Sequence, residues 1–151
     1  MITRAKWVAG LATLLLAGAS SGVALGHGSY SVSFSGVPTS AVKGQHLTYS
    51  VTAKTPILKP PMEATLAVYT SGTTACAATA EGEAKLRHEG KARSAFLTKY
   101  YGEFKGSEHL PLSSEGTHHI CAYVYDVPAH TLADRHALFV VTPPLPKSPH
   151  H

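Results

Sequence analysis

The chain has 151 residues and carries 13 Lys and Arg against 9 Asp and Glu. Two of the basic residues, Arg4 and Lys6, lie in an N-terminal segment that we expect to be removed, so 11 remain and the net charge falls to +2. This balance excludes a nucleic-acid-binding protein, which would concentrate basic residues on one face. The 125 residues left after that segment suit one domain with one core.

The first 26 residues have the three-part layout of a secretory signal peptide. A basic start is followed by an apolar run at 8–17 and by a small, weakly polar stretch at 18–26. The apolar run is well short of the ~20 residues that a membrane-spanning helix needs. We therefore predict that residues 1–26 are cleaved off. The mature protein is then secreted, extracellular or periplasmic, without stable membrane insertion.

Two cleavage sites satisfy the requirement for small residues at the first and third positions before the cut. Ala24 with Gly26 would leave His27 as the first residue, whereas Gly22 with Ala24 would leave Leu25 first. The choice bears on metal binding, because an N-terminal His offers its free amine beside its imidazole to a copper ion.

Beyond the leader, apolar and polar residues alternate with a period of two, and Gly and Pro interrupt the pattern. This period is typical of half-buried β-strands. The predicted strands lie at 29–35, 47–53, 64–70, 95–101, 103–110, 120–125 and 137–141. About seven short strands at fairly regular spacing predict an all-β sandwich in a single domain. We expect a flexible tail rich in Pro and His to follow at 143–151.

Residues 77–93 depart from the strand pattern, because they are rich in Ala, Glu, Lys and Arg. This composition predicts one or two helical turns, limited in length by Gly82 and Gly90. The segment's basic residues are interleaved with acidic ones, which we interpret as a solvated face with compensated charge. These residues are Lys85, Arg87, Lys91 and Arg93 with Glu81, Glu83 and Glu89.

The two cysteines, Cys76 and Cys121, lie 45 positions apart, and the chain has no third. In a protein exported to an oxidising compartment, such a pair predicts a disulfide. The rival interpretation is a redox-active or metal-binding pair, but the chain has no Cys-x-x-Cys, and two thiols alone make a poor zinc site. We expect the disulfide to lock two stacked sheets together.

Residues 115–125, Glu-Gly-Thr-His-His-Ile-Cys-Ala-Tyr-Val-Tyr, resemble the sixth strand of immunoglobulin-like domains. Upstream, a Lys-Gly-Gln turn at 43–45 and the segment Cys-Ala-Ala-Thr-Ala at 76–80 extend the likeness. Together these segments are similar to a broad group of uncharacterised secreted bacterial proteins with a single immunoglobulin-like domain. The resemblance implies an immunoglobulin-like β-sandwich of about seven antiparallel strands at 27–142, with a short helical insertion near 77–93, and implies no activity.

Ten histidines are the compositional anomaly of this chain, and imidazole suits both copper and zinc. His118 and His119 are adjacent on a predicted strand, so their side chains point to opposite faces and cannot hold one ion together. Dispersed surface histidines without a cofactor are therefore the preferred interpretation. The alternative is a copper or zinc site built on an N-terminal His27, with His119 or His136 completing the ligand set.

Aromatic residues offer a second candidate surface, because Tyr is enriched at interfaces. Tyr123 and Tyr125 share one strand face with Cys121, and we expect them on the outer side of the sheet. The opposite, core-directed face carries Ile120, Ala122 and Val124. The two tyrosines either pack against neighbouring strands or form an exposed strip for a protein or carbohydrate partner.

The sequence offers no catalytic constellation. It has no Gly-x-Ser-x-Gly elbow, and Asp126 and Asp134 are its only aspartates. Glu103 and Glu108 lie on a short stretch whose expected role is solvation rather than glycoside hydrolysis. We therefore expect a secreted, noncatalytic module that binds a partner or has a structural role at the cell surface or in the medium. A metal-binding protein is the first alternative, and an enzyme of unidentified type is the second.

Overall fold

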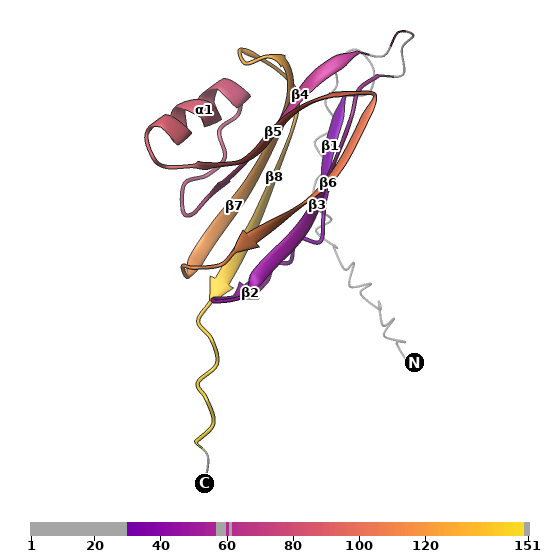
Figure 1. The fold of residues 1–151 in the computed structure, drawn as a ribbon. Coiled ribbons are helices and arrows are strands. Elements are labelled where there is room, and N and C mark those ends of the chain that lie inside the picture. The colour runs from indigo at the N-terminus through magenta and orange to yellow at the C-terminus, as the bar shows by residue number, and fades with distance from the viewer. Residues whose placement is uncertain (1–29, 57–59, 61, 150–151) are drawn as a thin grey trace, which may run out of the picture.

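The computed structural model describes residues 30–56, 60 and 62–149, so the predicted leader and His27 lie outside the described residues. The described elements, in chain order, are β1 (Ser31–Ser35), β2 (Ser40–Val42), β3 (His46–Lys54), β4 (Glu63–Ser71), α1 (Ala80–His88), β5 (Arg93–Tyr101), β6 (Glu103–Pro111), β7 (Gly116–Val127) and β8 (His130–Thr142). A three-stranded sheet has the order β1-β3-β6, and a five-stranded sheet has the order β2-β8-β7-β4-β5. The sheets form the two layers of a sandwich, with α1 on the outer side of the larger sheet (Figure 1).

The strand order confirms the predicted all-β, immunoglobulin-like sandwich. In the immunoglobulin arrangement, strands A, B and E belong to one sheet, whereas C, F and G belong to the other. In chain order these strands correspond to β1, β3 and β6 and to β4, β7 and β8, which are divided between the two sheets in the same way. Each of the seven predicted strands overlaps one of the observed strands.

The short strand β2 corrects the expectation of a wholly antiparallel sandwich. It has three residues and runs parallel to β8, with Ser40 opposite Val140 and Val42 opposite Thr142. Three residues are too few to display the alternation by which a strand is recognised in a sequence. This strand therefore forms because it pairs with the much longer β8, and its own sequence carries no strand pattern.

The main hydrophobic core lies between the sheets and follows from the alternation in the sequence. Leu47, Tyr49, Val51 and Ala53 of β3 are all buried, whereas the residues between them face outward or are half-buried. The larger sheet contributes Leu66, Val68, Ile120, Ala122, Val124 and Phe139. The core positions predicted on β7 are thus confirmed. Each large aliphatic side chain buried in this way stabilises the fold by about 1.5–3 kcal/mol.

The hairpin of β7 and β8 is longer than the predicted strands at 120–125 and 137–141. Its pairing extends from Gly116 opposite Val141 to Val127 opposite His130. The apolar centres of the strands were visible in the sequence, but most of the flanking residues are polar, so their part of the backbone ladder was not recognised. Beyond Thr142, residues 143–149 have no regular secondary structure.

Helix α1 lies within the predicted insertion at 77–93 and confirms it. Thr79 caps its N-terminus, because the Thr79 hydroxyl accepts a hydrogen bond of 3.1 Å from the Gly82 N–H. Glu81 and Glu83 lie in the first turn, where the helix dipole favours negative charge. Gly90 follows the helix with a left-handed backbone (φ +75°) that turns the chain toward β5. Across the described ranges, no helix has the length and apolar character needed to cross a bilayer.

Candidate functional site

The predicted disulfide between Cys76 and Cys121 is present, and its two Cα atoms are 5.7 Å apart. Its position corrects one expectation, because it does not join the two sheets. Cys121 points to the outer face of the larger sheet, and Cys76 lies in the connection between β4 and α1. The bond therefore fastens the helical insertion onto β7, on the side of the sheet opposite the main core.

The structure contradicts an exposed strip at Tyr123. The residue lies on the outer face, as predicted, but its side chain is 0% exposed. It packs with Tyr69 and Cys121 beneath Ala80 of α1, and Tyr125 is half-buried at the margin of this cluster. Strand alternation fixes the face to which a side chain points, but it does not reveal what covers that face. Here the covering element is the disulfide-bound insertion.

Polar contacts under the helix centre on Glu83, which is 0% exposed. The Glu83 Oε2 atom accepts a hydrogen bond of 2.7 Å from the Ala77 N–H and lies 3.0 Å from the Tyr123 hydroxyl. The same hydroxyl donates to the Ala77 carbonyl oxygen at 2.6 Å. Within the described residues, Glu83 Oε1 is buried without a hydrogen-bond partner. The interpretation of Glu83 as part of a solvated charged face is therefore wrong.

Burial keeps the Tyr123 hydroxyl in its protonated form. It raises the pKa of this group far above the ordinary value of 10.0, and the nearby Glu83 carboxylate raises that pKa further. Tyr123 thus acts as a hydrogen-bond donor that holds the β4–α1 connection and α1 together. We interpret this cluster as structural support for the insertion rather than as a binding surface.

The candidate metal ligands His119 and His136 lie on the same outer face of the β7–β8 hairpin. They are diagonal neighbours, because His119 is opposite Leu138 and His136 is opposite Cys121. His119 Nδ1 donates to the Gly72 carbonyl oxygen at 2.7 Å, and His136 Nε2 lies 3.0 Å from an oxygen of Asp134. Within residues 30–56, 60 and 62–149, no group of three or more potential metal ligands is present. The proposed third partner, His27, lies outside the described residues.

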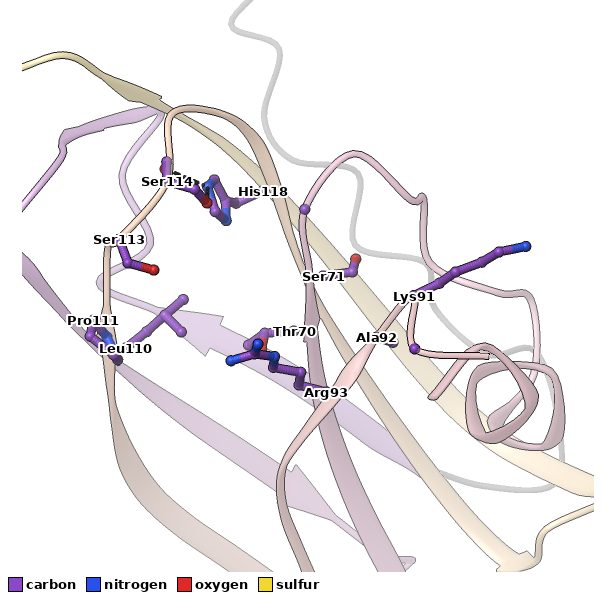
Figure 2. A pocket seen from close by; sticks show the side chains of 12 residues that line it. Thr70, Ser71, Lys91, Ala92, Arg93, Leu110, Pro111, Ser113, Ser114 and His118 are labelled. Atoms are coloured by element: carbon purple, nitrogen blue, oxygen red, sulfur yellow. Dashed lines mark hydrogen bonds between the residues drawn. The ribbon is translucent and has the colours of Figure 1, made fainter. Parts of the chain in front are cut away.

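A surface cavity of about 250 Å³, which we call the terminal cavity, lies at one end of the sandwich (Figure 2). It is formed where β4 and β6 end and where β5 and β7 begin, so both sheets contribute to its wall. Its described lining residues include cations, hydroxyl groups and a few aliphatic side chains but no carboxylate. The main ones are Thr70, Arg93, Leu110, Ser113, Ser114 and His118.

Arg93 is the cation that faces this cavity. Figure 2 shows its side chain extending toward Leu110, whereas the side chain of Lys91 extends away from the cavity. Lys91 is also paired with Glu89 at 3.1 Å. In the part of the chain that the structure describes, Arg93 has no carboxylate partner. Its guanidinium group therefore remains available to a ligand.

His118 of β7 also lines the cavity, and one of its ring nitrogens is already engaged. Its Nε2 atom lies 2.9 Å from the Ser114 carbonyl oxygen. Because a carbonyl oxygen can only accept, Nε2 carries the proton, and Nδ1 of the neutral ring is a hydrogen-bond acceptor. The ring also stacks on Phe139, with centroids 5.4 Å apart and planes inclined by 18°. Its orientation is thus fixed from two sides.

Sequence reasoning missed the terminal cavity. It placed Arg93 on a self-compensated charged face and treated His118 only as one of two adjacent histidines. The two residues are 25 positions apart, and the β-topology alone brings their strands to the same end of the sandwich. No local spacing in the sequence could have revealed this pairing.

No protein-family model and no curated protein sequence matches this chain. Among solved structures, a β-glucosidase from Listeria innocua has a TM-score of 0.48 and 15% identity over 75% of this chain, which spans 16% of that chain. The CARDB domain of the PF1109 protein from Pyrococcus furiosus, in complex with di-metal ions, has a TM-score of 0.47 and 14% identity over 76% of this chain and 88% of that chain. These likenesses are too weak to assign an activity, so fold and site define only an immunoglobulin-like sandwich with a polar terminal cavity.

Proposed function

We propose that the chain is an exported, noncatalytic binding module whose ligand occupies the terminal cavity. The predicted leader and the disulfide both support export, because disulfides persist mainly in oxidising compartments outside the cytosol. The leader predicts a mature protein that is released at the cell surface, into the periplasm or into the medium.

One observation carries the assignment of the site: within the described residues, the cavity holds Arg93 without a carboxylate partner, together with the hydroxyl groups of Thr70 and Ser113. In the described structure, neither Thr70 nor Ser113 makes a side-chain hydrogen bond. A few convergent polar groups in a concave surface are typical of a small-molecule site. At about 250 Å³ the cavity lies just below the usual range for drug-sized ligands, so it suits one sugar unit. Of the two expected partner classes, carbohydrate therefore fits better than protein.

The geometry around Ser114 and His118 supports a noncatalytic role. Ser114 Oγ lies 3.5 Å from His118 Nε2, which at first suggests a nucleophile beside its base. However, the Nε2 proton is donated to the Ser114 carbonyl oxygen, so this nitrogen has no lone pair to accept the serine proton. In addition, the described lining contains no carboxylate, and glycoside hydrolysis ordinarily uses a pair of them.

A nuclear magnetic resonance titration tests this function. The ¹⁵N-labelled, oxidised mature protein is mixed with a panel of neutral and acidic methyl glycosides, and its backbone amide shifts are recorded. We expect the largest shifts at the amides of Gly72, Arg93, Ser114 and His118, because these residues line the cavity. No shift with any sugar, or shifts confined to the opposite end of the sandwich, would contradict the proposal.

A further inference from the structure

We propose that the terminal cavity recognises a uronic acid unit, with Arg93 binding its carboxylate and His118 accepting a hydrogen bond from one of its hydroxyl groups. The inference rests on the function proposed above, because it specifies the ligand of the same cavity. It predicts an acidic polysaccharide, or an acidic sugar released from one, as the natural ligand.

The first step is the chemistry of Arg93. A guanidinium group presents its N–H donors in a planar fork that matches the two oxygens of a carboxylate. Arg93 is the first residue of β5, and it follows Ala92, which is buried and fixes the backbone at this point. Because the described cavity wall supplies no acidic group to Arg93, the ligand is the natural source of its counter-charge.

The second step is the protonation pattern of His118. With Nε2–H donated to Ser114, the neutral ring offers only the Nδ1 lone pair to a ligand. A lone pair repels a fully deprotonated anion such as sulfate but accepts a hydrogen bond from an alcohol. The cavity thus combines a site for a carboxylate with a site for a hydroxyl group, and a uronic acid carries both on one ring.

The remaining wall fits a sugar as well. The hydroxyl groups of Thr70 and Ser113 can each donate and accept hydrogen bonds, as sugar hydroxyls require. Leu110, toward which Arg93 extends in Figure 2, gives the site an apolar surface for the C–H bonds of the ring. A flat, purely cationic surface would offer neither feature.

Calorimetric titration of the oxidised mature protein tests the inference with three matched probes: methyl glucuronoside, its methyl ester and methyl glucoside. We expect the glucuronoside to bind about tenfold more tightly than either neutral probe, since a charge-assisted hydrogen bond contributes more than a neutral one. Free glucuronate and an oligouronide, titrated in parallel, distinguish a released sugar from a polysaccharide as the source.

Two variants and one control variant locate the effect. Arg93→Gln should abolish the preference for the glucuronoside, whereas Arg87→Gln, with the same charge change at an exposed position on α1, should keep it. His118→Phe retains a ring that can stack on Phe139 but removes the acceptor. It should weaken binding of the glucuronoside several-fold but keep the preference for the glucuronoside over its methyl ester, which depends on Arg93.

The outcomes separate this inference from the proposed function. If neutral and acidic glycosides bind equally and both shift the cavity amides, the binding function stands and the uronic acid assignment is wrong. If sulfate, which carries no hydroxyl group at neutral pH, binds as tightly as the glucuronoside, the role of His118 as a hydroxyl acceptor is wrong. If no probe shifts the cavity amides, both proposals fail.

Discussion

Replacing Cys76 and Cys121 together with serine should lower the free energy of unfolding by about 4 kcal/mol, because the disulfide closes a loop of 45 residues in the unfolded chain. A loss of this size is a large part of the ~5–15 kcal/mol by which domains are ordinarily stable. Urea unfolding followed by circular dichroism measures it. The wild-type protein treated with a reductant is the matched control and should unfold at the same urea concentration as the double variant.

The location of the disulfide predicts which part of the fold opens first when the bond is removed. The bond joins the β4–α1 connection to the outer face of β7, whereas the main core between the sheets does not depend on it. Hydrogen exchange should therefore accelerate first in α1 and in the connection around Cys76, with β3 and β7 still protected. Equal protection of α1 in the oxidised and reduced proteins would contradict this role of the bond.

The second large effect is expected at Glu83, a carboxylate buried under α1. Glu83→Ala should destabilise the fold by about 2 kcal/mol, because it leaves the half-buried Ala77 N–H without its acceptor and removes one partner of Tyr123. Glu81→Ala is the matched control, since Glu81 lies in the same helical turn but is exposed. Both changes remove a negative charge near the helix N-terminus, so that contribution cancels in the comparison.

A double-mutant cycle with Tyr123→Phe isolates the contact itself. The Tyr123 hydroxyl reaches both Glu83 and the Ala77 carbonyl oxygen, so the two substitutions should be coupled by more than about 0.5 kcal/mol. If Glu83→Ala and Glu81→Ala cost the same in thermal unfolding, or if the cycle shows purely additive effects, the buried cluster does not hold the insertion.

The sandwich could be predicted because most of its strands have a recognisable pattern of apolar residues in their own sequence. In β3 every second residue is apolar, and at the centre of β7 Ile120, Ala122 and Val124 have the same spacing; this period indicated both the strands and the faces that enter the core. The short β2 carries no such period and depends on its parallel pairing with β8. The pairing of Cys76 with Cys121 could be predicted because no third cysteine competes. The sequence did not show that the bond fastens the helical insertion to the outer face of β7.

The functional candidates were harder to predict, because they depend on what covers each face and on which strand ends meet. Tyr123 was assigned to the correct face, but the insertion that buries it is far away in the sequence. Glu83 lies among charged residues in the sequence, as a solvated residue would. In the structure, its position in the first turn of α1 directs the side chain toward β7. Arg93 and His118 share a cavity only because the topology places the starts of β5 and β7 at one end of the molecule.

The claim on which the rest depends is that this chain works outside the cytosol in an oxidised form. Intact-mass spectrometry of the protein recovered from its native culture, alkylated without reduction, tests it most directly. We expect a chain that begins at Leu25 or His27, carries no alkyl group and weighs two hydrogen atoms less than its reduced form. A chain that still begins at Met1, with both Cys76 and Cys121 alkylated, would contradict export and the disulfide together.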